Sequence, residues 1–98
     1  MTTGNAQRRA ARVRVANYHE SCLTELVDRL AVELDAYRAT SIDVHDADRA
    51  IHQYHHSAGQ LWRFCFGARS DVEFAVQLLD TQTQPIGWWA RGAARKGH

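Results

Sequence analysis

The stretch Ala-Thr-Ser-Ile-Asp at residues 39–43 separates two long segments that each have the periodicity of an amphipathic helix. Thr40, Ser41 and Asp43 are good N-cap residues, because a short side-chain oxygen accepts a hydrogen bond from an unpaired amide at the start of the next helix. Asp46 and Asp48 then add negative charge where the helix dipole favours it. The stretch therefore predicts the end of one helix and the start of another.

Before this break, from about residue 7 to residue 39, apolar side chains recur at intervals of three, four and seven residues. This spacing forms one stripe along a helix with 3.6 residues per turn. His19 occupies a stripe position where an apolar residue would be expected. The stripe consists of Val13, Ala16, Leu23, Leu26, Val27, Leu30, Leu34 and Tyr37.

A second stripe extends from about residue 43 to residue 66, and Gly67 fits a C-cap whose backbone turns left-handed. Two long amphipathic helices with a short connection pack antiparallel. We therefore predict an all-α fold built on a long antiparallel helical hairpin, 7–39 and 43–66. The second stripe consists of Val44, Ala47, Ile51, Tyr54, Ala58, Leu61 and Cys65.

A short third helix is predicted at about 71–83. Ser70 and Glu73 have the spacing of a capping box, in which each side chain satisfies the backbone amide of the other residue. Val72, Ala75, Val76 and Leu79 form an apolar stripe, and the helix should end before Pro85. A helix of this length is suited to cover the open end of the hairpin.

The length of 98 residues predicts a single domain, 1–98. A hydrophobic share of 45% argues against a disordered chain. No stretch approaches the roughly 18 consecutive apolar residues of a membrane span, and the first 14 residues lack the apolar region of a secretory signal. Cys22 and Cys65 are far apart and form no CxxC pair. We therefore expect a cytoplasmic protein with reduced thiols and no membrane contact.

The two ends of the chain are basic, whereas the body between them is acidic. We expect the ends, 1–8 and 91–98, to be flexible. Their arginines suggest contact with nucleic-acid phosphates as an alternative function, although the sequence has no helix-turn-helix, zinc-finger or basic-zipper pattern. The residues that would make this contact are Arg8, Arg9, Arg12, Arg14, Arg91 and Arg95.

A histidine cluster lies in the second helical segment. Asp48, His52 and His56 are four residues apart and share one helix face, with His55 beside them. Imidazole and carboxylate groups would suit zinc or a similar divalent ion. Solvent-facing helix residues account for the same pattern, and neither HExxH nor a repeated Glu-x-x-His is present. We predict no cofactor and keep divalent-metal binding by these four residues as a further alternative.

Aromatic residues form the candidate interaction site. Trp62, Phe64 and Phe66 point around one helix rather than to one side of it, so they cannot all enter the same hairpin core. The third helix and the tail with Trp88 and Trp89 must cover some of them, or another chain must do so. The predicted interaction residues are Tyr54, Trp62, Phe64, Phe66, Trp88 and Trp89.

Three segments, 46–55, 61–65 and 88–92, resemble a group of small helical proteins from high-GC actinomycete genomes. The resemblance covers about residues 13–95. It implies a helical fold without implying an activity, and it directs attention to Tyr54, Trp62 and the Trp88-Trp89 pair.

The sequence carries no catalytic motif that we recognise. It has no defensible Ser-His-Asp arrangement, Gly-rich phosphate loop or pair of catalytic carboxylates, and neither cysteine has an adjacent base. We therefore expect a non-enzymatic protein-interaction or self-assembling helical protein. Its partner would be another protein or a second copy, because a homodimer buries the faces that one hairpin leaves exposed.

Overall fold

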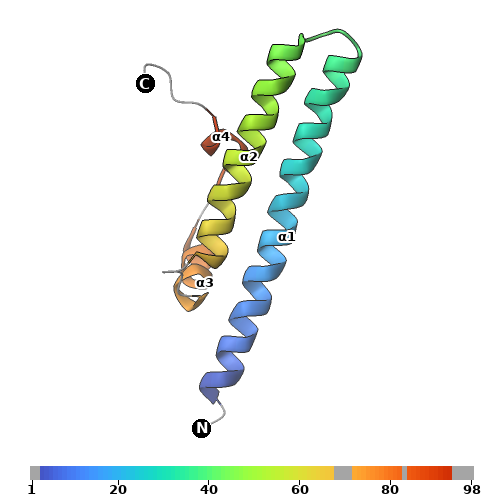
Figure 1. Ribbon diagram of the computed structural model, residues 1–98. Coiled ribbons are helices and arrows are strands. Elements are labelled where there is room, and N and C mark those ends of the chain that lie inside the picture. The colour runs from blue at the N-terminus through green and yellow to red at the C-terminus, as the bar shows by residue number, and fades with distance from the viewer. Residues whose placement is uncertain (1–2, 68–71, 83, 94–98) are drawn as a thin grey trace.

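The computed structural model describes residues 3–67, 72–82 and 84–93 of the chain. Two long helices, α1 (Thr3–Arg38) and α2 (Val44–Phe66), form an antiparallel pair (Figure 1). They are followed by α3 (Val72–Thr81) and the single-turn α4 (Trp88–Arg91). The described residues contain no strand. The prediction of an all-α helical hairpin with a short third helix is confirmed.

The helix boundaries differ in detail from those predicted. Helix α1 begins four residues earlier than expected, so residues 3–8 of the predicted basic end are helical. Helix α3 ends at Thr81, before Pro85 as predicted. Ser70, on which the predicted capping box depends, lies outside the described residues, as do residues 1–2 and 94–98. Helix α4 was not predicted.

The turn between α1 and α2 combines a C-cap and an N-cap. The backbone amide of Ser41 donates to the Ala36 carbonyl oxygen at 2.8 Å, and that of Thr40 donates to the Tyr37 carbonyl oxygen at 3.0 Å. These two bonds define a Schellman motif with Thr40 at its left-handed position, where φ is 62°. Of the three cap candidates, Asp43 caps α2, because its Oδ1 accepts a hydrogen bond from the Asp46 amide at 2.8 Å.

Thr40 is a β-branched residue in a backbone conformation that suits glycine. We expect Thr40→Gly to raise the free energy of unfolding by about 1 kcal/mol, because the left-handed conformation no longer crowds a Cβ atom. Urea unfolding followed by circular dichroism measures the change. Ser41→Gly is the control and should give no gain, since the backbone of Ser41 has no positive φ. Equal gains in both variants would contradict this account of the turn.

Gly67 ends α2 in a way that the sequence did not reveal. Its φ of −61° and ψ of 157° are extended, so the predicted left-handed turn is wrong. Its amide donates to the Arg63 carbonyl oxygen at 3.0 Å, and a Cβ atom at residue 67 would lie 2.5 Å from that oxygen. Glycine is therefore needed at residue 67 because the chain passes close to the end of α2. Its φ is one that any residue can adopt.

The core lies between the hairpin and the two short helices. Helix α3 packs mainly against α1, and α4 packs mainly against α2, on the same side of the hairpin (Figure 1). Buried side chains from all four helices contact one another there: Val15, Leu26, Leu61, Cys65, Ala75 and Trp88. The two short helices therefore cover one side of the hairpin and leave its other side open.

Candidate protein-interaction surface

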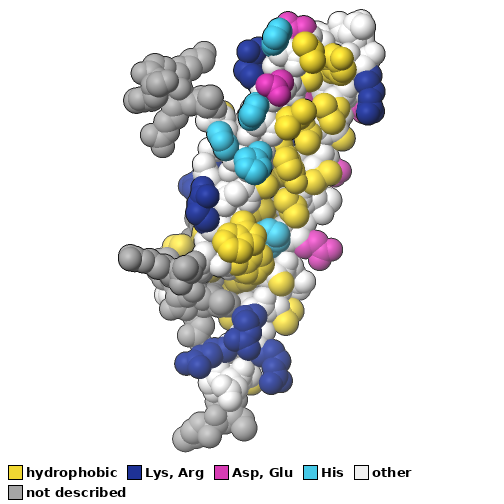
Figure 2. Space-filling view, in the orientation of Figure 1, with side chains coloured by type: hydrophobic (Ala, Val, Ile, Leu, Met, Phe, Trp, Pro, Cys, Tyr) yellow, Lys and Arg dark blue, Asp and Glu magenta, His cyan; other side chains and the backbone are white. Residues whose placement is uncertain are grey.

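The open side of the hairpin carries a row of exposed apolar side chains, which we call the apolar face. Figure 2 shows hydrophobic side chains as a band along the seam between α1 and α2. Trp62, the largest of them, is 53% exposed. The exposed members of the apolar face are Val27, Val44, Ile51, Trp62 and Phe66, and half-buried Leu23, Leu30, Leu34 and Ala58 lie between them.

Helix periodicity explains why these residues share a side. On α1, Leu23, Val27, Leu30 and Leu34 are separated by four, three and four residues, the spacing of one helix stripe. On α2, Ile51 and Trp62 lie about 120–140° around the helix from Ser57, which faces α4. Helix α2 thus presents one face to α4 and a second, apolar one to the open side.

An aromatic cluster occupies the end of the apolar face farthest from the turn. The ring centroids of Trp62 and Phe66 are 6.2 Å apart. The His19 ring from α1 meets Phe66 edge-on, with centroids 4.9 Å apart. The polar residue that interrupts the α1 stripe therefore lies in this aromatic cluster.

The other predicted interaction residues are packed against the core. Trp88 is buried, and its Nε1–H donates to the Tyr18 hydroxyl at 2.8 Å. Phe64 packs against it with ring centroids 5.5 Å apart. Tyr54 and Trp89 are half-buried and contact the core cluster. The structure thus divides the predicted set, leaving Trp62 and Phe66 as its exposed members.

Helix α4 is held on α2 through its backbone carbonyl groups. The Gln53 Nε2 and the Ser57 Oγ donate to the Trp89 carbonyl oxygen at 2.8 and 3.1 Å. The Gln60 Nε2 donates to the Arg91 carbonyl oxygen at 3.0 Å. These three residues lie four and three positions apart, which places them on one face of α2. This polar stripe was the signal in the sequence that could have indicated a docked segment.

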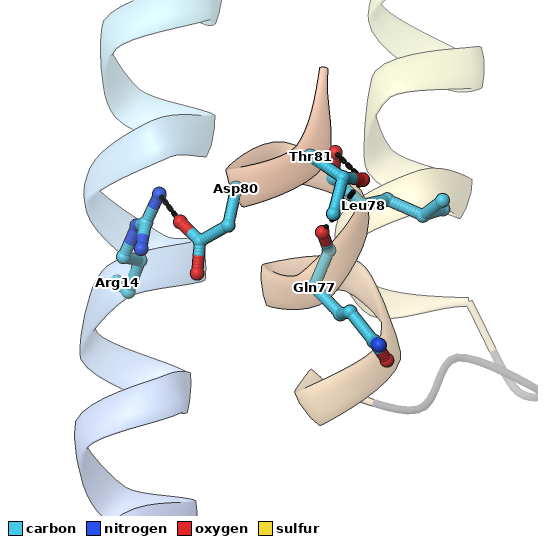
Figure 3. A network of polar contacts seen from close by, with 5 residues as sticks. All are labelled: Arg14, Gln77, Leu78, Asp80 and Thr81. Atoms are coloured by element: carbon cyan, nitrogen blue, oxygen red, sulfur yellow. Dashed lines mark hydrogen bonds and ion pairs between the residues drawn. The ribbon is translucent and has the colours of Figure 1, made fainter.

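The arginines of the nucleic-acid alternative do not form one surface. Arg14 binds Asp80 of α3 at 2.5 Å (Figure 3), next to Thr81, whose hydroxyl donates to the backbone of its own helix. The Arg91 guanidinium lies 5.3 Å from the centre of the Trp88 ring. Arg95 lies outside the described residues. Arg8, Arg9 and Arg12 are exposed at the start of α1.

The residues of the metal-binding alternative lie on the exposed surface of α2. The Nε2 of His52 is 3.4 Å from the Oδ2 of Asp48, and both side chains are more than half exposed. The rings of His55 and His56 are 6.2 Å apart. Within residues 3–67, 72–82 and 84–93, no three His, Cys, Asp or Glu side chains are grouped so that they could hold a metal ion.

Both cysteines are free thiols: Cys65 lies in the core, and half-buried Cys22 packs against it. Burial, with a smaller contribution from the nearby Cys22, raises the pKa of the Cys65 thiol to about 11. Burial also raises the pKa of Cys22, and it raises that of the Tyr18 hydroxyl to about 12. A thiol that stays protonated at neutral pH is a weak nucleophile. Cys65 therefore serves as a small buried apolar residue, as predicted.

Comparison with known proteins gives no assignment: no family model, no curated protein and no solved structure matches this chain. Among the helices that the structure describes, none has the length and apolarity needed to cross a membrane.

Proposed function

We propose that this protein functions by self-association, in which two copies pack their apolar faces together into a four-helix arrangement. The observation that carries the proposal is the row of exposed apolar side chains on the side of the hairpin opposite α3 and α4. Contiguous exposed apolar surface of this kind usually marks a contact with another molecule. On this proposal the chain acts as an assembly element and not as an enzyme.

The size of the apolar face suits a stable dimer. Helix α2 has 23 residues, which corresponds to a length of about 35 Å. Two packed helices are about 20 Å wide, so each copy would contribute roughly 700 Å². The total of about 1,400 Å² lies within the range of stable, specific protein interfaces.

A second copy is the occupant that this face fits best. The face has the length of a hairpin and an apolar seam between two helices, and a second hairpin offers the same length and the same seam. Two antiparallel helix pairs that meet in this way form a four-helix bundle, with each seam closed by the helices of the other pair. A two-fold arrangement lets one surface serve both copies.

The test compares two exposed valines of α1. Val27 is 47% exposed on the apolar face, whereas Val32 is 60% exposed and lies about 140° away around the helix. We expect the unaltered chain to sediment as a dimer at tens of micromolar. Val27→Glu should weaken dimerisation at least about 100-fold, because the dimer would bury an unpaired carboxylate. Analytical ultracentrifugation measures the fractions of monomer and dimer.

Val32→Glu is the matched control, since it adds the same charge to the same helix outside the proposed interface. It should leave dimerisation within about twofold of the unaltered chain, and circular dichroism should show that both variants remain helical. An unaltered chain that is monomeric at several hundred micromolar would exclude the proposal. Equal weakening by the two substitutions would also contradict it.

Nucleic-acid contact remains the second candidate, because Arg8, Arg9 and Arg12 are exposed at the start of α1. It predicts that a monomeric chain binds a short DNA duplex at low salt and that the affinity falls steeply with salt concentration. Replacing the three arginines by glutamine should then abolish binding. Self-association without duplex binding at low salt would exclude this candidate.

A further inference from the structure

The two ends of the hairpin differ in charge. The first turns of α1, residues 3–14, contain four arginines and no acidic residue. Residues 35–49, around the turn, contain four aspartates and two arginines. Both of those arginines pair within the turn region, Arg38 with Asp35 and Arg49 with Asp46. The hairpin thus has a basic open end, visible in Figure 2, and a turn end with an excess of acid.

The two ends of the apolar face also differ in the size of their side chains. Trp62 and Phe66 lie at the open end, whereas the smaller Val44 and Ile51 lie toward the turn. Well-packed interfaces place large side chains opposite small ones, so that the two layers interdigitate. A second copy in the same orientation would instead place the large aromatic rings opposite each other.

From these two asymmetries, and resting on the proposed self-association, we propose that the two copies pack antiparallel. The arginine-rich start of α1 in each copy then lies against the acidic turn end of the other. The bulky Trp62 and Phe66 of one copy pack over the partner's Val44 and Ile51. The charges and the packing both favour this orientation over the parallel one.

Distances along the helix are consistent with this arrangement. The apolar face is centred near Val27 on α1, and Arg12 lies about 22 Å from it toward the N-terminus. The turn at residues 39–43 lies about 20 Å from Val27 in the other direction. A two-fold axis at the centre of the face therefore brings Arg12 level with the partner's turn, and Arg8 and Arg9 lie about one helical turn beyond it.

A parallel dimer would have the opposite electrostatics. It would place Arg8, Arg9 and Arg12 of one copy beside the same residues of the other, and acidic turn beside acidic turn. Charged groups on two surfaces in contact interact appreciably when they lie within a Debye length of each other, which is about 10 Å at 0.1 M salt. The sign of the charge effect on dimerisation therefore reports the orientation.

The experiment measures dimerisation of the full chain in which Arg8, Arg9 and Arg12 are all replaced by glutamine, a good helix former. In the antiparallel dimer this change should weaken association about tenfold at 50 mM NaCl. For the unaltered chain, raising NaCl from 50 to 500 mM should weaken association, because salt screens the attraction between the ends. The control changes the same three arginines to lysine and should keep the affinity within about threefold.

The outcomes separate orientation from association. Stronger dimerisation on neutralising the arginines, together with stronger dimerisation at high salt, would overturn the antiparallel orientation while leaving self-association in place. An unchanged affinity in the glutamine variant would also overturn the orientation. A chain that stays monomeric in all forms would overturn both proposals.

Discussion

Replacing Gly92 by alanine will detach α4 from α2 and lower the free energy of unfolding by about 2–4 kcal/mol. A Cβ atom at residue 92 would overlap Ser57 Oγ and the backbone oxygen of Gln53, and it would lie 2.7 Å from the Ser57 amide nitrogen. Two of these atoms belong to the backbone of α2, so no rotamer change relieves the overlap. The φ of −84° at Gly92 suits any residue, so the effect comes from close contact alone.

The loss should be large because several interactions depend on this approach. The hydrogen bonds of Gln53, Ser57 and Gln60 to the α4 carbonyl oxygens would all lengthen. Trp88 would leave the core and its bond to the Tyr18 hydroxyl. Urea unfolding at a fixed protein concentration measures the stability, and hydrogen exchange of the 88–92 amides measures the docking of α4.

Gly87→Ala is the matched control, because a Cβ atom at Gly87 has no heavy atom within 4 Å. Its φ of −85° also suits alanine. This substitution, at the start of the same short helix, should change the free energy of unfolding by no more than about 0.5 kcal/mol. A similar loss in both variants would show that the contact between Gly92 and α2 is not the cause.

Leu61→Ala should lower the free energy of unfolding by about 3–4 kcal/mol. Leu61 is completely buried at the centre of the cluster where the four helices meet. Truncating it removes apolar contacts and leaves a cavity that the surrounding helices can close only in part. Equilibrium unfolding in urea, monitored by circular dichroism, gives the value. A loss below about 1 kcal/mol would contradict the central position of Leu61.

Ile51→Ala provides the comparison on the same helix. Ile51 is 45% exposed on the apolar face, so its truncation should cost the isolated chain about 1 kcal/mol or less. The same change should weaken dimerisation, because the proposed interface buries this side chain. The pair of variants thus separates residues that stabilise the fold from residues that serve assembly.

The hairpin was predictable because a long helix repeats the same spacing of apolar residues turn after turn. The apolar stripes of α1 and α2 continue for many turns, and a break with several capping residues lies between them. The conformation of Thr40 was not predictable from its type, because a threonine rarely takes a positive φ and is held there by the two bonds of the Schellman motif.

Helix α4 was not predicted because a helix of a single turn is too short to show a periodic pattern of apolar residues. Its position depends on hydrogen bonds between residues 31 to 36 positions apart, and the polar stripe on α2 could indicate that a segment docks there but not which segment it is. The prediction of the site was limited in the same way, because it also depends on contacts between residues that are far apart in the sequence. Periodicity indicated that Trp62, Phe64 and Phe66 do not all lie on one side of α2, but the residues that are covered depend on where Trp88 docks.

For the polar residues of the site, too, the sequence predicted positions along a helix better than contacts between helices. The periodicity placed His19 on the stripe of α1, and the structure places it on the apolar face against Phe66. The helical spacing of Asp48 and His52 did bring these two side chains together. Local spacing thus predicted neighbours within a helix, whereas contacts between helices required the folded chain.

The three tryptophans lie in three different environments, and this gives the molecule a built-in set of optical reporters. Trp88 is buried with its Nε1–H bonded to Tyr18, Trp89 is half-buried with the Arg29 guanidinium 5.0 Å from its ring centre, and Trp62 is open to solvent. Indole emission shifts to the blue when water leaves the ring. The emission of Trp88 therefore follows the docking of α4, while that of Trp62 responds when a second surface closes over the hairpin, without any added dye.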